Sequence, residues 1–163
     1  MSRVGSRPKP SSPDIEARIR NQRRRDTDPE MLLRSALWRR GLRYRVDVNV
    51  VGRRRKVDLA FTRSKVAVFV DGCFWHRCPE HGSVPRANRV WWLAKLDANV
   101  ERDLDSNREL TSAGWLVIRV WEHEDPVKAA DRIEGEVRRR GSGRCDSRDV
   151  VGDVVQEAFL ESQ

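Results

Sequence analysis

The stretch Val66-Ala67-Val68-Phe69-Val70, followed by Asp71-Gly72-Cys73-Phe74-Trp75-His76-Arg77-Cys78-Pro79-Glu80-His81, decides the fold. Its first segment is apolar without alternation, which predicts a central strand that is covered on both faces of a sheet. The residues that follow combine thiols, imidazoles, carboxylates and aromatic rings in one loop. We therefore expect a sheet that carries a chemically active loop at the end of this strand.

The sequence on either side predicts a mixed α/β sheet with helices on its faces. Polar and apolar residues alternate over 44–50, which predicts a strand with one wet face. The long segment 90–113 has apolar residues near helical spacing and ends at Gly114. In chain order we expect a helix up to Gly41, strands over 44–50, 57–61 and 66–70, a helix over 90–113, a strand over 115–121 and a helix over 126–140.

The first helix is predicted from its start and stop signals. Asp28 suits the N-cap, Pro29 suits the first turn, and Gly41 suits the end of the helix. Between these signals lies an apolar stripe at helical spacing, which we expect to face the core. The stripe consists of Leu32, Leu33, Ala36 and Leu37.

The chain has 163 residues and a net charge of +8, with 33 Lys and Arg against 25 Asp and Glu. A basic surface of this kind favours a polyanion such as nucleic acid; the alternative is an arginine-rich composition without a binding role. Residues 1–26 are expected to form a basic flexible arm that either orders on DNA or stays solvated, 27–140 the main domain, and 141–163 a tail. No apolar run reaches the length of a membrane span and the N-terminus lacks a signal peptide, so we expect a cytoplasmic protein.

Two of the three cysteines lie beside histidines, which favours metal ligation in a reducing compartment over a disulfide framework. Cys73, Cys78 and His81 offer three ligands from one loop. If strand 115–121 lies beside strand 66–70, His123 supplies the fourth. Such a Cys2His2 shell predicts a structural zinc ion; the alternative is a pair of reduced thiols near surface histidines.

Asp58 interrupts an apolar strand, and a carboxylate there needs a partner. A hairpin turn over 62–65 brings it beside Val70 and Asp71, and an aspartate beside a backbone carbonyl or a second carboxylate offers the oxygen ligands that Mg²⁺ prefers. His76 could then take a proton from an attacking water, and Asp103 on the long helix could orient it. The alternatives are a structural strand aspartate and an ordinary solvated helix face.

Large aromatic rings lie close to this region. Phe74 and Trp75 are in the polar loop, and Trp91 and Trp92 open the long helix. Tryptophan is usually a core residue, but on a basic surface that faces DNA such rings can act as wedges between base pairs. A mismatched pair lowers the cost of unstacking.

From Arg25-Asp26-Thr27 to Trp121-Glu122-His123 the chain resembles the very short patch repair (Vsr) endonucleases. The resemblance is carried above all by Gly72-Cys73-Phe74-Trp75-His76 and Asn99-Val100-Glu101-Arg102-Asp103. It implies a restriction-endonuclease-like fold and an enzyme that nicks DNA beside a T:G mismatch. Where the family pattern has a histidine before Gly-Cys-Phe-Trp-His, this chain has Asp71, which could itself bind metal.

The resemblance also implies a role for individual residues. Asp58 and the backbone carbonyl of Val70 would bind Mg²⁺, His76 would be the general base with Asp103 beside it, and Cys73, Cys78, His81 and His123 would bind Zn²⁺. Asp71 and Glu30 would be further acidic residues of the catalytic site. The DNA-contacting residues would be Phe74, Trp75 and Trp92, with Lys95, Asn99 and Arg25.

The expected function is Mg²⁺-dependent nicking of double-stranded DNA at T:G mismatches, which arise when 5-methylcytosine deaminates. The protein would be a bacterial, nucleoid-associated monomer that works with mismatch-repair helper proteins. Two rival functions stay open on the sequence. One is a restriction-type endonuclease that cuts matched sites, and the other is a non-catalytic DNA-binding module with a zinc loop.

Overall fold

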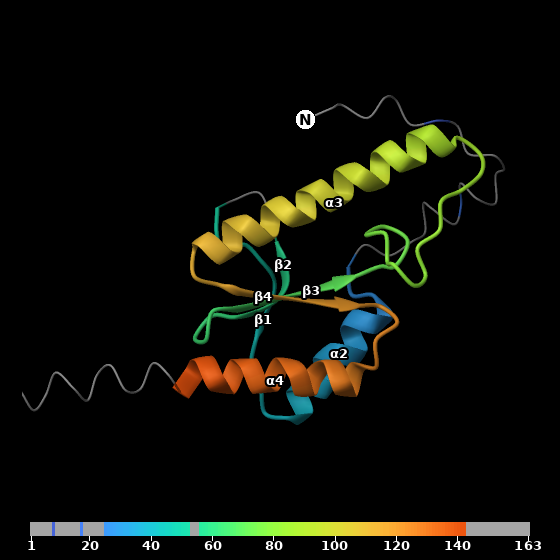
Figure 1. Ribbon diagram of the computed structural model, residues 1–163. Coiled ribbons are helices and arrows are strands. Elements are labelled where there is room, and N and C mark those ends of the chain that lie inside the picture. The colour runs from blue at the N-terminus through green and yellow to red at the C-terminus, as the bar shows by residue number, and fades with distance from the viewer. Residues whose placement is uncertain (1–7, 9–16, 18–24, 53–55, 143–163) are drawn as a thin grey trace, which may run out of the picture.

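The computed structural model describes residues 25–52 and 56–142, together with residues 8 and 17 (Figure 1). The terminal arm and tail that we predict from the sequence therefore lie almost entirely outside the described residues. The described helices and strands are α2 (Asp28–Arg39), β1 (Arg45–Val48), β2 (Val57–Phe61), β3 (Val66–Asp71), α3 (Arg89–Ser112), β4 (Leu116–Trp121) and α4 (Pro126–Ser142).

The strands form one mixed sheet in the order β1-β2-β3-β4. β3 pairs antiparallel with β2 and parallel with β4, with Val66 opposite Leu116 and Asp71 opposite Trp121. The prediction of a central strand is therefore confirmed, because β3 has a neighbour on each side. The parallel pairing also brings the C-terminal ends of β3 and β4 together, so the segments after Asp71 and Trp121 leave the same edge of the sheet.

Helices cover both faces of the sheet, α3 on one and α2 with α4 on the other (Figure 1). The larger core lies under α2 and α4 and includes Leu37, Val68 and Ile133, while Ala67 and Leu110 belong to the core under α3. Among the described helices, none combines the length and the hydrophobicity that a membrane-spanning segment requires.

The first helix departs from its prediction in two details. Thr27, and not Asp28, is the N-cap residue, with Pro29 in the first turn. Leu33, Ala36 and Leu37 are buried, but Leu32 is exposed. The prediction for Leu32 was wrong because the buried stripe of this helix is narrower than the run of apolar letters suggests.

Candidate active site and metal centre

Asp58 lies where β2 and β3 separate. The described ladder between the two strands stops at the pair Leu59–Val68, and beyond this pair the Val70 amide donates a hydrogen bond of 2.8 Å to the Asp58 carboxylate. The two residues that we predict to share a metal are therefore in contact. In a β-strand, the N–H and the C=O of one residue point to the same neighbouring strand. The Val70 carbonyl therefore points to the side of β2, where Asp58 lies.

Burial raises the pKa of the Asp58 carboxylate. Desolvation, together with the negative charges of Glu30 and Asp71, raises its pKa to about 6, even though the Val70 hydrogen bond and the charge of Arg34 act to lower it. A desolvated carboxylate among other carboxylates is a chemical fit for a small divalent cation, whose charge would favour its ionised form.

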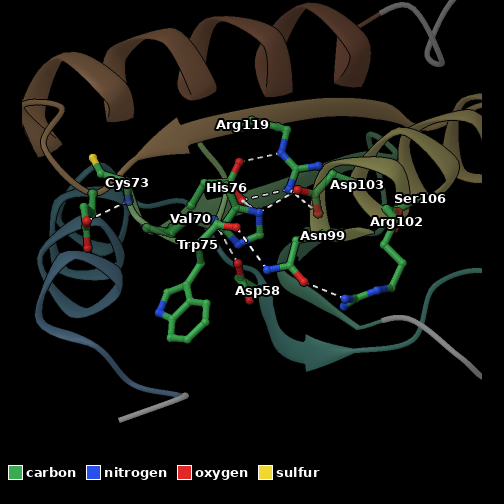
Figure 2. A network of polar contacts seen from close by, with 12 residues as sticks. Asp58, Val70, Cys73, Trp75, His76, Asn99, Arg102, Asp103, Ser106 and Arg119 are labelled. Atoms are coloured by element: carbon green, nitrogen blue, oxygen red, sulfur yellow. Dashed lines mark hydrogen bonds and ion pairs between the residues drawn. The ribbon is translucent and has the colours of Figure 1, made fainter. Parts of the chain in front are cut away.

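His76 and Asp103 form the pair that the sequence predicts. His76 Nδ1 lies 2.6 Å from Asp103 Oδ2 (Figure 2). Burial acts to lower the pKa of His76, but the hydrogen bond to Asp103 and the charges of Asp71 and Asp103 outweigh it and raise the pKa above its ordinary value. Because Nδ1 is held by Asp103, Nε2 is the nitrogen that can take a proton.

Asp71 is buried at the end of β3, with 3% of its surface exposed. Both of its carboxylate oxygens accept hydrogen bonds from Arg119 on β4, and one of them lies 3.7 Å from His76 Nδ1. The structure therefore places Asp71 beside His76 in an ion pair with Arg119.

The four sulfur and nitrogen donors predicted for zinc come together at the edge of the sheet. Their ligand atoms all lie within 4.8 Å of one another, with Cys73 Sγ 3.0 Å and Cys78 Sγ 3.8 Å from His123 Nδ1. Cys78 Sγ lies 4.0 Å from His81 Nδ1. A tetrahedral zinc ion at about 2.0–2.3 Å from each donor needs separations of this size. The donor set thus fits zinc, and the parallel pairing of β3 with β4 explains why His123 joins it.

Two further side chains fix the loop that follows β3. Glu122, directly after β4, accepts a hydrogen bond of 2.7 Å from the Cys73 amide. Asn99 on α3 donates a hydrogen bond of 3.1 Å to the Trp75 carbonyl and accepts one from Arg102 (Figure 2). Asn99, predicted as a DNA contact, is only 8% exposed, so in this structure its amide holds the loop to the helix.

The aromatic rings form one cluster. Phe74 lies 5.0 Å from Trp75 and 5.3 Å from Trp92 between ring centroids, both edge to face. Trp91 packs against Trp92 at 4.9 Å. All four rings are half-buried, so part of their surface is left for a ligand. The cluster joins the loop to the start of α3, beside His76.

Of the remaining predicted residues, Glu30 lies close enough to Asp58 for its charge to raise the Asp58 pKa. Glu30 is buried in the first turn of α2, where it accepts hydrogen bonds from Thr27 Oγ1, the Asp26 amide and Arg34. Arg25 is exposed and lies 3.1 Å from Asp47. Lys95 is half-buried on α3, one turn beyond Trp91.

Sequence reasoning missed Arg119 and Glu122. Arg119 interrupts the apolar strand Leu116–Trp121 just as Asp58 interrupts its own. The signal that singled out Asp58 could therefore have found Arg119. Glu122 carries no comparable signal, because a glutamate after a strand is ordinary.

Comparison with known proteins places this site in context. Residues 12–80 match the family model described as DNA mismatch endonuclease Vsr. The type II nicking enzyme V.NaeI of Lentzea aerocolonigenes is 49% identical over 124 residues, which span 74% of this chain and 75% of that enzyme.

Two further relatives agree. The DNA mismatch endonuclease Vsr of Escherichia coli K12 is 37% identical over 116 residues, covering 67% of this chain and 71% of the relative. The type II nicking enzyme V.NmeDIP of Neisseria meningitidis serogroup C is 34% identical over 139 residues, covering 80% and 91%. The relatives are therefore named as enzymes that nick DNA or act at mismatches.

Proposed function

This chain belongs to the Vsr family of DNA mismatch endonucleases, and from that membership we propose that it nicks one strand of duplex DNA beside a T:G mismatch. The chain is thus a DNA-hydrolysing enzyme, which disfavours the non-catalytic binding module. The observation that carries the proposal is the contact of His76, in the loop after β3, with Asp103 on α3, beside the aromatic cluster that joins the same loop to the same helix. This loop joins a proton acceptor to a surface that can read a weak base pair.

The reaction follows from the arrangement of these residues. Asp103 holds Nδ1 of His76, so that Nε2 can take a proton from the water that attacks the phosphorus. The bond from phosphorus to the leaving 3′ oxygen breaks and that oxygen takes up a proton, so the nick carries a 5′-phosphate and a 3′-hydroxyl, from which the strand can be resynthesised. Asp58, with the carbonyl of Val70, would hold Mg²⁺. When bound, that ion supplies stabilisation of the charge that develops on the phosphate and the leaving oxygen.

Zinc would have a structural role in this enzyme. Two cysteines and two histidines fill all four positions of a tetrahedron, which leaves none for a reacting water. The ion would hold the loop after β3 to the end of β4, and with the loop both His76 and the rings Phe74 and Trp75.

We extend the proposal to the fold and the cellular setting. An antiparallel hairpin that carries Asp58, a parallel neighbour strand and helices on both faces support a restriction-endonuclease-like fold. The enzyme would act as a monomer on nucleoid DNA in the bacterial cytoplasm, together with mismatch-repair helper proteins. Since T:G pairs arise from deaminated 5-methylcytosine, a cytosine methyltransferase is the expected companion.

The proposed function is tested with end-labelled duplexes that differ in a single base pair. We expect nicking of one strand in the T:G duplex with Mg²⁺, and little or none in the matched duplex or with other mismatches. The His76→Ala protein, purified in the same way, controls for a contaminating nuclease. Equal cutting of the matched duplex would refute the mismatch requirement and favour the restriction-type endonuclease.

The aromatic cluster gives a separate prediction about binding. Replacing Trp92 with alanine is expected to weaken binding to the T:G duplex by about 10- to 100-fold, because stacking of a ring on a base contributes about 1–3 kcal/mol. Zinc content should not change. The measurement is the dissociation constant on a fluorescent duplex in the absence of Mg²⁺.

The matched control is Trp38→Ala. Trp38 is 57% exposed near the C-terminal end of α2, where the Arg43 guanidinium covers its ring at 3.7 Å. Its loss should leave DNA binding unchanged. If Trp92→Ala unfolds the protein or binds as tightly as the wild type, the rings are core residues and the wedge assignment is wrong.

A further inference from the structure

Arg119 contacts two of the predicted catalytic residues, Asp71 and Asp103. Its Nε and Nη2 donate to the two oxygens of Asp71, and Nη2 also lies 3.0 Å from Asp103 Oδ1. Nη1 donates to Asn107 at 3.2 Å, and the guanidinium carbon lies 5.0 Å from the Phe69 ring centroid. Arg119 is thus fixed from several sides, by α3 as well as by β3 (Figure 2).

The two carboxylates beside the histidine are not equivalent. Asp103 divides its oxygens, with Oδ2 at 2.6 Å from His76 Nδ1 and Oδ1 directed to Arg119. Asp71 has both oxygens on Arg119, and its closer one is 3.7 Å from the same Nδ1. One imidazole N–H therefore has two carboxylates within reach, and only Asp103 is at hydrogen-bonding distance.

On the basis of the proposed function, we propose that Arg119 is a positioning residue that assigns Asp103, and not Asp71, as the partner of His76. The planar guanidinium donates in fixed directions, so pairing with Asp71 sets the plane in which Nη2 meets Asp103. That contact orients the Asp103 carboxylate, and Asp103 in turn orients the ring. The positive charge also keeps the buried Asp71 carboxylate and the half-buried Asp103 carboxylate close together, where they would otherwise repel each other.

With Arg119 in this role, a chain that has Asp71 at this position can still use His76. A buried carboxylate without a cation is costly. Arg119 supplies that cation from the neighbouring strand, at a position held by the β3–β4 register, since Asp71 pairs with Trp121 and Phe69 with Arg119. Asp71 is then accounted for as the anchor of Arg119.

Three variants test the inference. Arg119→Gln removes both the positive charge and the planar set of guanidinium N–H donors. Arg119→Lys keeps the charge but not the planar donors (the fork). Arg119→Gln/Asp71→Asn also removes the buried carboxylate that the first variant would leave unpaired. Arg138→Gln is the matched control, because Arg138 is exposed and pairs with Glu134 on α4. The double variant keeps the test decisive if Arg119→Gln alone does not fold.

Two readouts are used. With the T:G duplex as substrate, we expect Arg119→Gln and the double variant to lower kcat by about 10- to 100-fold, the usual effect of losing a residue that orients a catalytic group, with KM nearly unchanged. On the free protein, the Nδ1 proton of ¹⁵N-labelled His76 should give a protected, downfield signal in the wild type. That signal should be lost in both variants and kept in Arg138→Gln.

The outcomes separate this inference from the proposed function. The ring signal needs neither DNA nor Mg²⁺, so it tests the positioning role even if the wild type fails to nick T:G duplexes. The inference would be overturned if the double variant kept both the His76 Nδ1 proton signal and the kcat of the wild type. Full activity of Arg119→Lys would also overturn it, because charge without the fork would then suffice.

Discussion

Replacing Asp58 with asparagine is expected to abolish Mg²⁺-dependent nicking and also to stabilise the folded protein at pH 7.5. Loss of the residue that would hold the ion should lower the nicking rate by about 10³-fold or more. The gain in stability has a separate cause, since an ionised carboxylate is buried at this position without Mg²⁺. Asparagine keeps an oxygen that can accept the Val70 amide and carries no charge.

The sign follows from the pKa values. Asp58 has a pKa near 3.8 when exposed and about 6 in the folded protein. Below pH 3.8 both states are protonated and the group contributes nothing, but as the pH rises to 6 the unfolded state loses its proton first and the wild type loses stability. The full effect, present above pH 6, is on the order of 1–3 kcal/mol. The free energy of unfolding of Asp58→Asn, relative to that of the wild type, should therefore increase between pH 4 and pH 6.5.

The measurement is urea unfolding from pH 4 to pH 8 without added magnesium, beside a nicking assay with it. Added Mg²⁺ should stabilise the wild type but not Asp58→Asn. Asp131→Asn is the control, because Asp131 on α4 is exposed and forms an ion pair with Arg40 at the end of α2. Loss of this surface pair should change the free energy of unfolding by less than about 1 kcal/mol at any pH. If Asp58→Asn nicks at the wild-type rate, Asp58 does not hold the catalytic ion.

The sequence was most informative where apolar pattern and strand order act together. The apolar run Val66–Val70 predicted a central strand, and the neighbourhood of strand 115–121 predicted that His123 would reach Cys73; the structure confirms both placements. Asp58 could be singled out because a charge in an apolar strand needs a partner. These inferences depend only on the period of a strand and on which strands are neighbours.

Residues whose roles depend on the path of the loop could not be predicted in this way. Segment 72–88 has no periodicity, so the sequence did not show that the Trp75 carbonyl would meet Asn99. Nor did it show that Arg119 would lie between Asp71 and Asp103, because that requires the height of α3 above the sheet. Side-chain partners across a loop depend on packing, which local pattern does not record.

Replacing Cys78 with serine is expected to remove zinc from the protein and to abolish nicking together with mismatch binding. The four donors connect the loop after β3 to the end of β4 through side chains from both segments, beside the single hydrogen bond of the Cys73 amide to Glu122. Structural zinc contributes on the order of 10 kcal/mol in small zinc domains, so its loss should lower the free energy of unfolding by more than about 3 kcal/mol. The loop would then no longer hold His76 beside Asp103.

Three measurements decide this prediction: metal content per chain, urea unfolding and nicking of the T:G duplex. Cys145→Ser is the matched control, because it removes a thiol that is not among the four donors and lies outside the described residues; it should keep one zinc ion per chain and full activity. A shell with no open position for a reacting water can only have a structural role. Returning zinc to a refolded wild type should therefore recover stability and nicking together. If Cys78→Ser retains stoichiometric zinc, or nicks normally without it, the loop is held by Glu122 and Asn99 and the zinc assignment fails.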